Sequence, residues 1–375
     1  MLRQRIAYFL LFAISIVLIA GQVVPVRAEN FLNMVTDGSD VVDSADGVCT
    51  LREAMDTAFN NITYPVCGTG SATDTDVITI AANIIVTLSS GHTSLPNIEN
   101  DNPNGVDVRI NGSASTIIVN NYAFDVDPNA GFILENITIM NSAVSAIQTY
   151  GGSETTLNNV SFNTNNATAN GGAIYNAGTM TITNGAFLGN IAGADGGAIY
   201  STGTLTINSS TFSNNIAGNR GGAISSNGTL TINATNPATS FSTNQSDTTA
   251  EFGGGGALFL DSASVSTISG VTFSGNTSDN GRGGAIYGGN FGAGSGSTIT
   301  GSVFTGNQNS GMMGAGGSTN GDGGAMFVQG AWTISHSRFT SNTALMGSGG
   351  ALAVFSQGNL TMDNSTVNGN TAAES

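Results

Sequence analysis

The fold is decided by a stretch that reads GGAIYSTGTLTINSSTFSNN (residues 196–215) and that recurs along the chain. We predict three short strands in it, at residues 197–200, 204–208 and 210–213. In the second strand, leucine and isoleucine alternate with threonine and asparagine, which is the pattern of a strand with one buried face. One such unit cannot bury its apolar face alone, so the repeats are expected to stack on one another.

Two motifs mark the repeats. Gly-Gly-Ala followed by Ile, Leu or Met begins at Gly171, Gly196, Gly221, Gly255, Gly283, Gly323 and Gly349. Phe-x-x-Asn begins at Phe162, Phe187, Phe212, Phe241, Phe273, Phe304 and Phe339, with a degenerate copy at Val367. Strands stacked at ~4.8 Å bury a continuous core, and parallel crossover connections are right-handed. The sequence therefore predicts an all-β fold, a right-handed parallel β-helix with three strands per coil over residues 76–375.

The first coils of this β-helix are expected to be irregular. Their strands are predicted at residues 77–80, 84–88, 106–110, 117–119 and 132–139.

Alignment of the repeats predicts two columns of stacked polar residues. Threonines in the strand before each phenylalanine should form an outward β-branched ladder, consisting of Thr156, Thr181, Thr206, Thr231, Thr267, Thr298, Thr333 and Thr361. The motif asparagines should stack at a tight corner and bond from coil to coil, namely Asn165, Asn190, Asn215, Asn244, Asn276, Asn307, Asn342 and Asn370. The glycines are expected where a Cβ atom would clash.

Residues 1–28 are predicted to be a secretory signal peptide. Arg3 and Arg5 precede an unbroken apolar run at residues 6–20, and Ala28 ends a stretch that a signal peptidase can cleave. The alternative is an uncleaved anchor, but the run is shorter than the ~20 residues that a membrane-spanning helix needs. No other stretch is apolar enough to cross a bilayer, so we expect no membrane span in the mature chain.

Residues 29–75 are predicted to be a cap segment before the first coil. Residues 51–59 carry one apolar stripe of a short helix, and Thr50 with Glu53 has the spacing of a capping box. A helix at this position would cover the open edge of the first coil.

Cys49 and Cys67 flank this helix. In an exported protein we expect them to form a disulfide, with two free buried thiols as the alternative. Closing a loop of this size contributes roughly 3 kcal/mol to stability.

Two parts of the sequence resemble known families. The stretch Cys49-Thr-Leu-Arg-Glu-Ala-Met55, preceded by Asp46-Gly47 and followed by Cys67, resembles the CSLREA domain at the start of many exported bacterial proteins, with Thr for Ser at position 50. The Gly-Gly-Ala and Phe-x-x-Asn motifs resemble the polymorphic outer membrane protein repeat of chlamydial autotransporter adhesins. Together the resemblances cover residues 46–370 and imply a β-helix on or outside the cell. The second also implies adhesion.

Composition excludes one class of partner. The chain has no lysine, and loss of residues 1–28 leaves five arginines against 24 acidic residues, a formal charge of −19. Such a chain repels phosphate backbones and anionic lipid. We therefore expect no nucleic-acid binding.

The sequence offers no identifiable catalytic site. A polysaccharide lyase or glycosidase of the pectin-lyase-like fold is the main alternative, but this rests on fold analogy. A glycosidase needs two carboxylates within ~10 Å, and we expect no acidic pair on neighbouring coils in one column. Asp195 with Arg220, and Arg282 with Asp322, are expected to form ion pairs between coils. The two histidines are far apart in the chain and are expected to be ordinary surface residues.

One acidic cluster precedes the helix. Asp37, Asp40, Asp43 and Asp46 are weak candidates for Ca²⁺ binding through oxygen ligands. Their spacing does not match an EF-hand, and a solvated acidic loop is the preferred interpretation. No other cofactor is expected.

The leading hypothesis is a non-catalytic, secreted or cell-surface β-helix protein for adhesion or envelope structure. Its ligand would be a carbohydrate or a host or cell-surface molecule. We expect this ligand to bind at the insertions 245–254 and 308–322, with neutral drift of these loops as the alternative. A minor alternative is ice binding by Thr-x-Thr on three successive coils. After Asn370 the pattern requires another Gly-Gly-Ala, so a further domain or partner is expected at that edge, unless the chain is a fragment.

Overall fold

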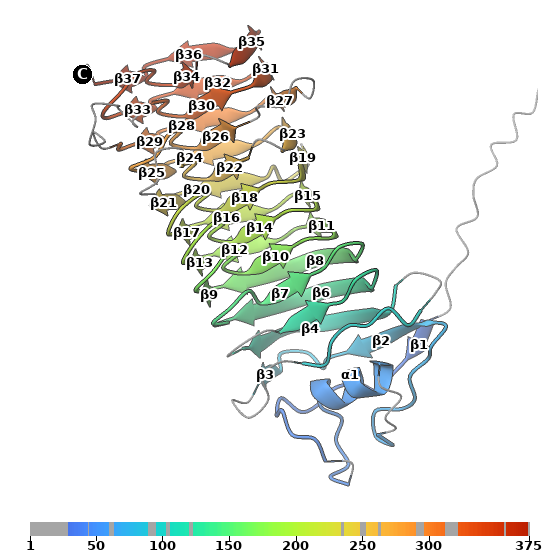
Figure 1. The fold of residues 1–375 in the computed structure, drawn as a ribbon. Helices are drawn as coiled ribbons and strands as arrows, with labels where there is room; N and C mark the ends of the chain where they lie inside the picture. Colours follow the sequence, from blue (N-terminus) through green and yellow to red (C-terminus); the bar gives the residue numbers. More distant parts are fainter. Residues whose placement is uncertain are drawn as a thin grey trace, which may run out of the picture.

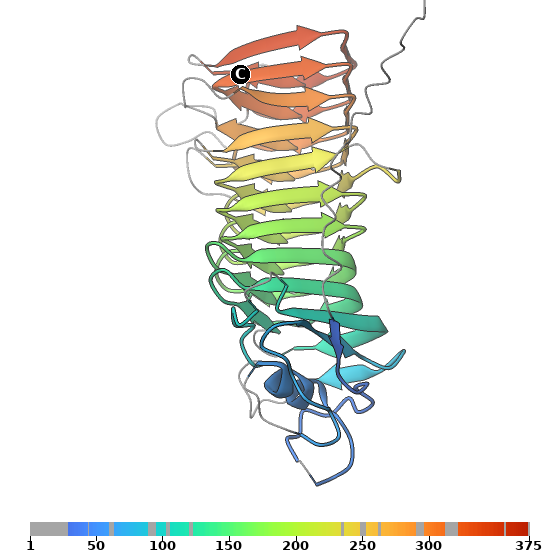
Figure 2. The same cartoon turned by 90° about the vertical axis from the view of Figure 1, so that its right-hand side faces the viewer.

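The chain folds into one rod of stacked coils (Figures 1 and 2). The computed structural model describes residues 29–373 apart from 44, 60–63, 89–94, 103–105, 120–122, 234–235, 248–252, 262–263, 290–295, 312–321 and 356–357. The predicted signal peptide and His92 lie outside the described residues. All strand pairings between coils are parallel, as for Thr204 with Thr229, so the predicted parallel β-helix is confirmed.

One coil shows how the repeat is built. It contains β14 (Ile199–Ser201), β15 (Thr204–Asn208), β16 (Thr211–Ser213) and β17 (Ile216–Ala217). The strands β15 and β16 belong to one long sheet, whereas β14 and β17 belong to two further sheets. The rod is therefore a three-sided solenoid.

Two of the three sheets begin partway along the rod. The nine-stranded sheet consists of β5 (Phe124–Val126), β7 (Ile147–Thr149), β10 (Ile174–Asn176), β14, β18 (Ile224–Ser226), β22 (Leu258–Leu260), β26 (Ile286–Gly289), β30 (Met326–Gln329) and β34 (Leu352–Val354). The eight-stranded sheet consists of β9 (Asn166–Ala167), β13 (Ile191–Ala192), β17, β21 (Gln245–Asp247), β25 (Thr277–Asp279), β29 (Gln308–Asn309), β33 (Thr343–Ala344) and β37 (Thr371–Ala372).

The long sheet carries the remaining strands. These are β1 (Glu29–Phe31), β2 (Thr75–Thr79), β3 (Ile85–Thr87), β4 (Val108–Ile118), β6 (Gly131–Met140), β8 (Glu154–Asn163), β11 (Thr179–Thr183), β12 (Ala186–Leu188), β15, β16, β19 (Thr229–Asn233), β20 (Ser240–Ser242), β23 (Val265–Ser269), β24 (Thr272–Ser274), β27 (Ser297–Thr300), β28 (Val303–Thr305), β31 (Ala331–Ser335), β32 (Arg338–Thr340), β35 (Asn359–Asp363) and β36 (Thr366–Asn368).

The number of strands per coil differs from the prediction. The coil described above has four strands, because two residues after the corner asparagine, Ile216 and Ala217, pair with the coils on either side. A two-residue strand is too short to show an alternating pattern in the sequence. The bend between β15 and β16 lies at Ser209, whose φ of 49° is in the left-handed region.

The irregular first coils are simpler than predicted. The strands expected at residues 106–110 and 117–119 are one strand, β4, which runs through the polar residues between them. Its register against β6 shifts between Asn111 and Ser115, so a bulge absorbs the extra residues.

The core is a stack of identical side chains. The phenylalanines of the Phe-x-x-Asn motif are buried and lie on one another, with ring centroids 4.5 Å apart for Phe187 and Phe212 and 5.1 Å apart for Phe241 and Phe273. Burial of each such ring contributes about 1.5–3 kcal/mol. The repeat of one apolar residue per coil thus builds a continuous core along the rod.

The two motif glycines are needed for different reasons. Gly196 has a φ of 70°, which favours glycine. A Cβ atom on Gly197 would collide with the carbonyl oxygen of Gly222 on the next coil. The first glycine therefore makes the turn, and the second allows the coils to approach closely.

The N-terminal end of the rod is closed by a helix, as predicted (Figure 1). This helix, α1 (Leu51–Phe59), has the predicted bounds and is buried on nearly every side. The Thr50 amide donates to Glu53 Oε2 (3.0 Å) and the Glu53 amide to Thr50 Oγ1 (3.3 Å), so the capping box is present. No helix in the described parts of the chain is long and apolar enough to span a membrane.

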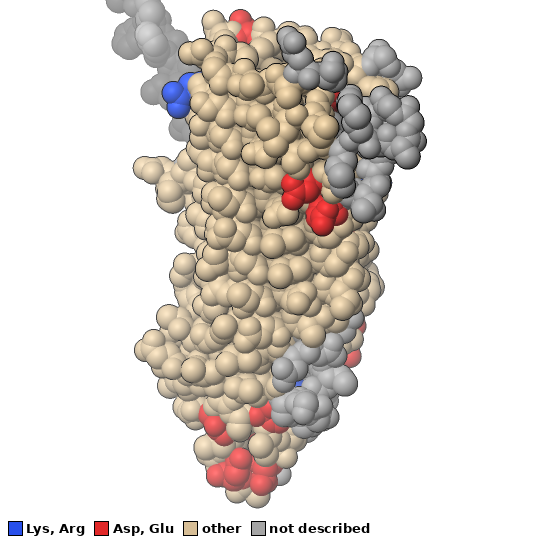
Figure 3. All heavy atoms as spheres, turned by 90° about the vertical axis from the view of Figure 1, so that its left-hand side faces the viewer, with Lys and Arg blue, Asp and Glu red and all other residues tan. Residues whose placement is uncertain are grey.

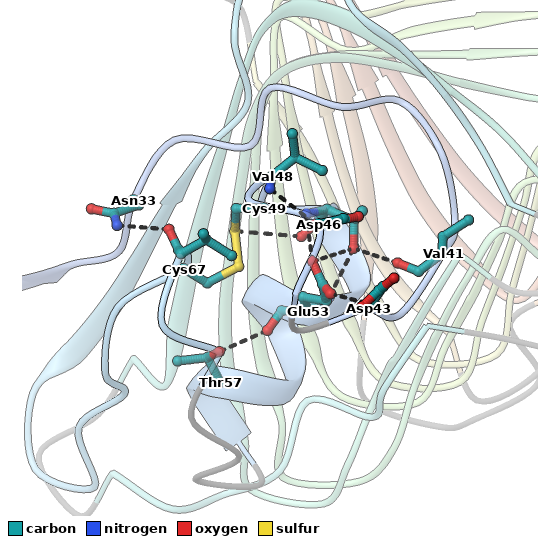
Figure 4. The surroundings of a disulfide bond; sticks show 11 residues. Asn33, Val41, Asp43, Asp46, Val48, Cys49, Glu53, Thr57 and Cys67 are labelled. Atoms are coloured by element: carbon teal, nitrogen blue, oxygen red, sulfur yellow. Dashed lines mark hydrogen bonds between the residues drawn. A yellow bond between two sulfur atoms is a disulfide. The ribbon is translucent and has the colours of Figure 1, made fainter.

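The predicted disulfide is confirmed. Cys49 and Cys67 are bonded and join the start of α1 to the segment that follows it (Figure 4). The Asn33 amide donates to the Cys67 carbonyl (2.9 Å), which attaches the chain after β1 to the same point. The cap is therefore held by a covalent bond as well as by packing.

Candidate binding surface on the nine-stranded sheet

The corner asparagines form a buried hydrogen-bonded ladder. Asn215 Nδ2 donates to Asn244 Oδ1 (2.9 Å) and to the Phe187 carbonyl (3.1 Å). Its Oδ1 accepts from the amide and the Nδ2 of Asn190, both at 3.0 Å. Both amide hydrogens and both lone pairs are used, so this column stabilises the corner and has no capacity left for a ligand.

The threonines lie in one register on the outer side of the long sheet. Thr181, Thr206 and Thr231 are direct partners on successive coils, and the column continues to Thr361. The neighbouring outer column, in contrast, changes from Thr229 to Val265. The Thr-x-Thr face required for the ice-binding alternative is therefore three coils long.

The four aspartates before α1 are not brought together. Asp40 forms a buried, two-pronged ion pair with Arg52, with Nε to Oδ1 at 2.6 Å and Nη2 to Oδ2 at 3.0 Å. Asp37, Asp43 and Asp46 each accept an amide two residues further along the chain. No group of three or more metal-ligating side chains occurs in the described chain, which argues against the calcium interpretation.

The two expected ion pairs between coils differ. Arg282 Nε lies 3.8 Å from Asp322 Oδ2. The Arg220 guanidinium lies over the Phe259 ring, 4.9 Å from its centroid, and Asp195 accepts instead from Asn219 Nδ2 (2.7 Å). The expected direct ion pair between Asp195 and Arg220 is therefore not formed in the described chain, because an aromatic ring on the next coil competes for the arginine.

The remaining predicted features carry no site. His336 is exposed at a bend with a φ of 52°. The central parts of the two insertions, residues 248–252 and 312–321, lie outside the described residues, and the ligand site predicted on them lies there too.

An acidic pair that we did not expect lies on the eight-stranded sheet. Asp247 of β21 and Asp279 of β25 are register partners on adjacent coils. Figure 3 faces this side of the rod and shows acidic side chains among mostly uncharged ones. Both residues lie three positions after a corner asparagine. The alignment of the repeats on the Phe-x-x-Asn motif therefore already placed these two carboxylates in one column. Asp279 accepts from Gln245 Nε2 (2.6 Å), which ties it to its neighbour.

A column of aromatic residues on the nine-stranded sheet was also missed. It follows directly after each Gly-Gly-Ala-(Ile/Leu/Met) motif and points out of the core, and its members are Tyr175, Tyr200, Ser225, Phe259, Tyr287, Phe327 and Ala353. The Tyr175 and Tyr200 rings lie 5.3 Å apart at centroid. These two tyrosines are partly exposed, whereas Phe259, Tyr287 and Phe327 are buried.

A pocket of about 240 Å³ lies beside Tyr175. One wall comes from β7 and β10, and the other from the corner that follows β9. Its lining residues are Val144, Ser145, Gln148, Ala167, Thr168, Ala169, Asn170 and Tyr175. The pocket therefore combines an aromatic ring with hydroxyl and amide groups.

The pocket exists because the aromatic column begins at Tyr175. Tyr200 is its register partner on one side, and Gln148 is its partner on the other. Gln148 lacks a ring that would continue the stack. Tyr175 therefore contacts the Tyr200 ring and also lines the pocket.

Hydrogen bonds hold the floor of the pocket. Gln148 Nε2 donates to the Tyr150 hydroxyl (2.7 Å), and the Tyr150 side chain is in turn bonded to Asp125. Ser145 Oγ donates to the Gly171 carbonyl (2.7 Å). Asn170 Oδ1 accepts a hydrogen bond from the backbone amide of Asp195 on the next coil (3.1 Å). The polar groups of the pocket are thus fixed by the surrounding coils.

Carboxylates lie near the pocket but do not line it. Burial raises the pKa of Asp125, and the nearby Asp127 raises it further, while the Tyr150 hydrogen bond lowers it. Burial likewise raises the pKa of Asp195, against the opposing effect of Arg220. Burial also raises the pKa of the Tyr200 hydroxyl, which keeps this group neutral.

Comparison with known proteins identifies the repeat. Residues 184–202, 209–227 and 270–289 match the family model of the Chlamydia polymorphic membrane protein repeat. Each segment runs from a Phe-x-x-Asn motif through the next Gly-Gly-Ala motif. No curated protein is similar enough to the chain to count as a relative. The resemblance to the CSLREA domain stays a prediction, and the comparison supports the narrower statement that this β-helix carries repeats of the polymorphic membrane protein type.

Proposed function

We propose that the chain is a cell-surface protein that serves adhesion or envelope structure and catalyses no reaction. The observation that carries this proposal is the match of three separate coils to a repeat of Chlamydia membrane proteins. The high negative charge and the absence of lysine fit a protein that does not bind nucleic acid.

The construction of the coils supports a scaffold. The side chains of the phenylalanine and asparagine columns are buried and contact the equivalent side chains on neighbouring coils. A rod of this kind holds its outer residues at a fixed spacing of ~4.8 Å per coil. Recognition is then carried by outward columns and by the corners between sheets.

A polysaccharide-active enzyme is the second candidate, and one observation favours it. Asp247 and Asp279 lie side by side on adjacent coils, which is the type of carboxylate pair that a glycosidase uses. Gln245 and Ser310 both hydrogen-bond to Asp279, so this carboxylate is engaged structurally. We therefore keep adhesion as the proposal and treat the acidic pair as the residues to change in a test.

The test measures attachment and turnover in the same samples. Beads coated with the purified chain are applied to cultured cells and to plates coated with polysaccharides, and bound beads are counted after washing. We expect attachment above that of beads coated with an unrelated protein, with no saccharide ends released. Release of new ends that disappears in Asp247→Asn and Asp279→Asn variants would support the enzyme instead.

A further inference from the structure

We propose that the pocket beside Tyr175 binds one uncharged sugar ring, with the tyrosine ring as its stacking platform. This inference rests on the proposed function, because it names the chemistry of the surface ligand. It also assigns the binding site to β7, β10 and the corner after β9, rather than to the two long insertions.

The lining of the pocket selects against charged ligands. None of its eight side chains carries a charge, although the chain as a whole is strongly acidic. Asp125 is connected to the lining through Tyr150 and Gln148, and the Asp195 backbone amide through Asn170, but neither carboxylate lines the pocket. An anionic or a cationic sugar would find no ionic partner in the lining, and the net negative charge of the chain also disfavours an anion.

The pocket provides both kinds of contact that a sugar ring requires. A sugar ring has an apolar face of C–H bonds, which packs on an aromatic ring, and a rim of hydroxyl groups, which need hydrogen-bond partners. Tyr175 provides the ring. Gln148 Oε1 and Asn170 Nδ2 have no hydrogen-bond partner in the described chain and provide one acceptor and one donor.

These polar groups are already oriented. Gln148 is held through its Nε2 by Tyr150, and Asn170 is held through its Oδ1 by the Asp195 amide (3.1 Å). The atoms left over are therefore the ones that can face a ligand. Preorganisation of this kind lowers the entropic cost of binding.

The size of the pocket limits the ligand. Its 240 Å³ is below the roughly 300–1,000 Å³ of pockets that hold drug-sized ligands, so it suits one ring or the end of a chain. With so few atoms in contact, we expect a dissociation constant on the order of 1 mM per ring. Many copies on a surface would strengthen attachment by avidity.

The first experiment uses saturation-transfer NMR of the purified chain with methyl glycosides of glucose, galactose, mannose and N-acetylglucosamine. Galacturonate and glucuronate form the charged arm. We expect transfer to the ring protons of at least one neutral sugar and none to the uronates. Transfer only to the uronates, or to no sugar at all, would overturn the inference.

Variants locate the binding. Gln148→Tyr continues the tyrosine stack and fills the pocket, so it should weaken binding at least about tenfold. Tyr175→Ala removes the platform and should have a similar effect, whereas Tyr175→Phe keeps the ring and should stay within about threefold of the unmodified chain. Thr206→Tyr adds the same ring to the long sheet and serves as the matched control. Equal binding by Gln148→Tyr and the control would refute the site even if all variants fold.

The bead assay separates this inference from the proposed function. If beads attach to cells but the chain and its Gln148→Tyr variant attach equally, the sugar site is wrong and the adhesive role stands. If beads do not attach while the methyl glycosides bind in the NMR experiment, the site stands and the adhesive role is wrong. Circular dichroism of each variant shows whether the coils remain folded.

Discussion

Removal of one asparagine from the buried ladder should destabilise the rod strongly. Replacement of Asn215 by alanine takes away the acceptor of the Asn190 amide and of one Asn190 Nδ2 hydrogen. It also takes away a donor to the Phe187 carbonyl. An unsatisfied buried polar group costs about 1–3 kcal/mol, so two orphaned donors predict a loss of about 2–6 kcal/mol.

The assay must report on individual coils, because stacked repeats need not unfold in one step. We would combine urea unfolding followed by circular dichroism with hydrogen exchange of peptides that cover residues 187–216. The control is Asn227→Ala, since Asn227 is exposed and its side chain makes no hydrogen bond in the described chain. A loss below about 1 kcal/mol for Asn215→Ala, or a loss equal to that of the control, would refute the reasoning.

An isosteric change separates hydrogen bonding from shape. In Asn215→Asp the side chain can still accept from Asn190 but, when ionised, cannot donate to Asn244 or Phe187. A buried carboxylate beside two acceptor oxygens is unfavourable, so the variant should unfold more easily at pH 8 than at pH 4.5 relative to the unmodified chain. An equal loss of stability at pH 8 and at pH 4.5 would show that the charge of the aspartate plays no part.

Three further predictions concern the turn, the cap and pH. Gly197→Ala should lower the urea midpoint by more than an alanine substitution at an exposed serine, because its Cβ would meet the Gly222 carbonyl on the next coil. An unchanged urea midpoint would contradict the close approach of the two coils. Cys49→Ser should reduce stability by roughly 3 kcal/mol, measured by urea unfolding with and without reductant, and reductant should have no further effect on the variant. Burial and a neighbouring carboxylate raise the pKa of Asp101 to about 7, so its neutral form favours the folded state. Its stabilising contribution is complete below pH 4 and is lost as pH rises to about 7, and Asp101→Asn should flatten this part of the melting-temperature profile.

The repeat made most of the fold predictable. The spacing of Gly-Gly-Ala and Phe-x-x-Asn places the same residues in the same column, so the asparagine ladder could be inferred without coordinates. The bounds of α1 followed from its apolar stripe and from the capping box formed by Thr50 and Glu53. In both cases local pattern and packing agree.

The candidate site was missed for a specific reason. The strand after Gly-Gly-Ala was interpreted only for its apolar core residue, although the next position is aromatic in five of seven repeats. That position points outward, and the pocket depends on the single change from Tyr175 to Gln148 one coil earlier. The fourth strand, Ile216–Ala217, is too short to leave a periodic signal. The Arg220 contact with Phe259 depends on competition between an aromatic ring and Asp195, which spacing alone does not decide.

The central claim, that this rod recognises surfaces and catalyses nothing, is tested most directly by incubating the purified chain with a panel of neutral and acidic polysaccharides, with and without Ca²⁺. Bound chain and newly formed reducing or unsaturated ends are measured in the same samples. The account predicts retention on neutral polysaccharides, no new ends and no dependence on Ca²⁺. New ends that increase with time and with protein concentration would contradict it.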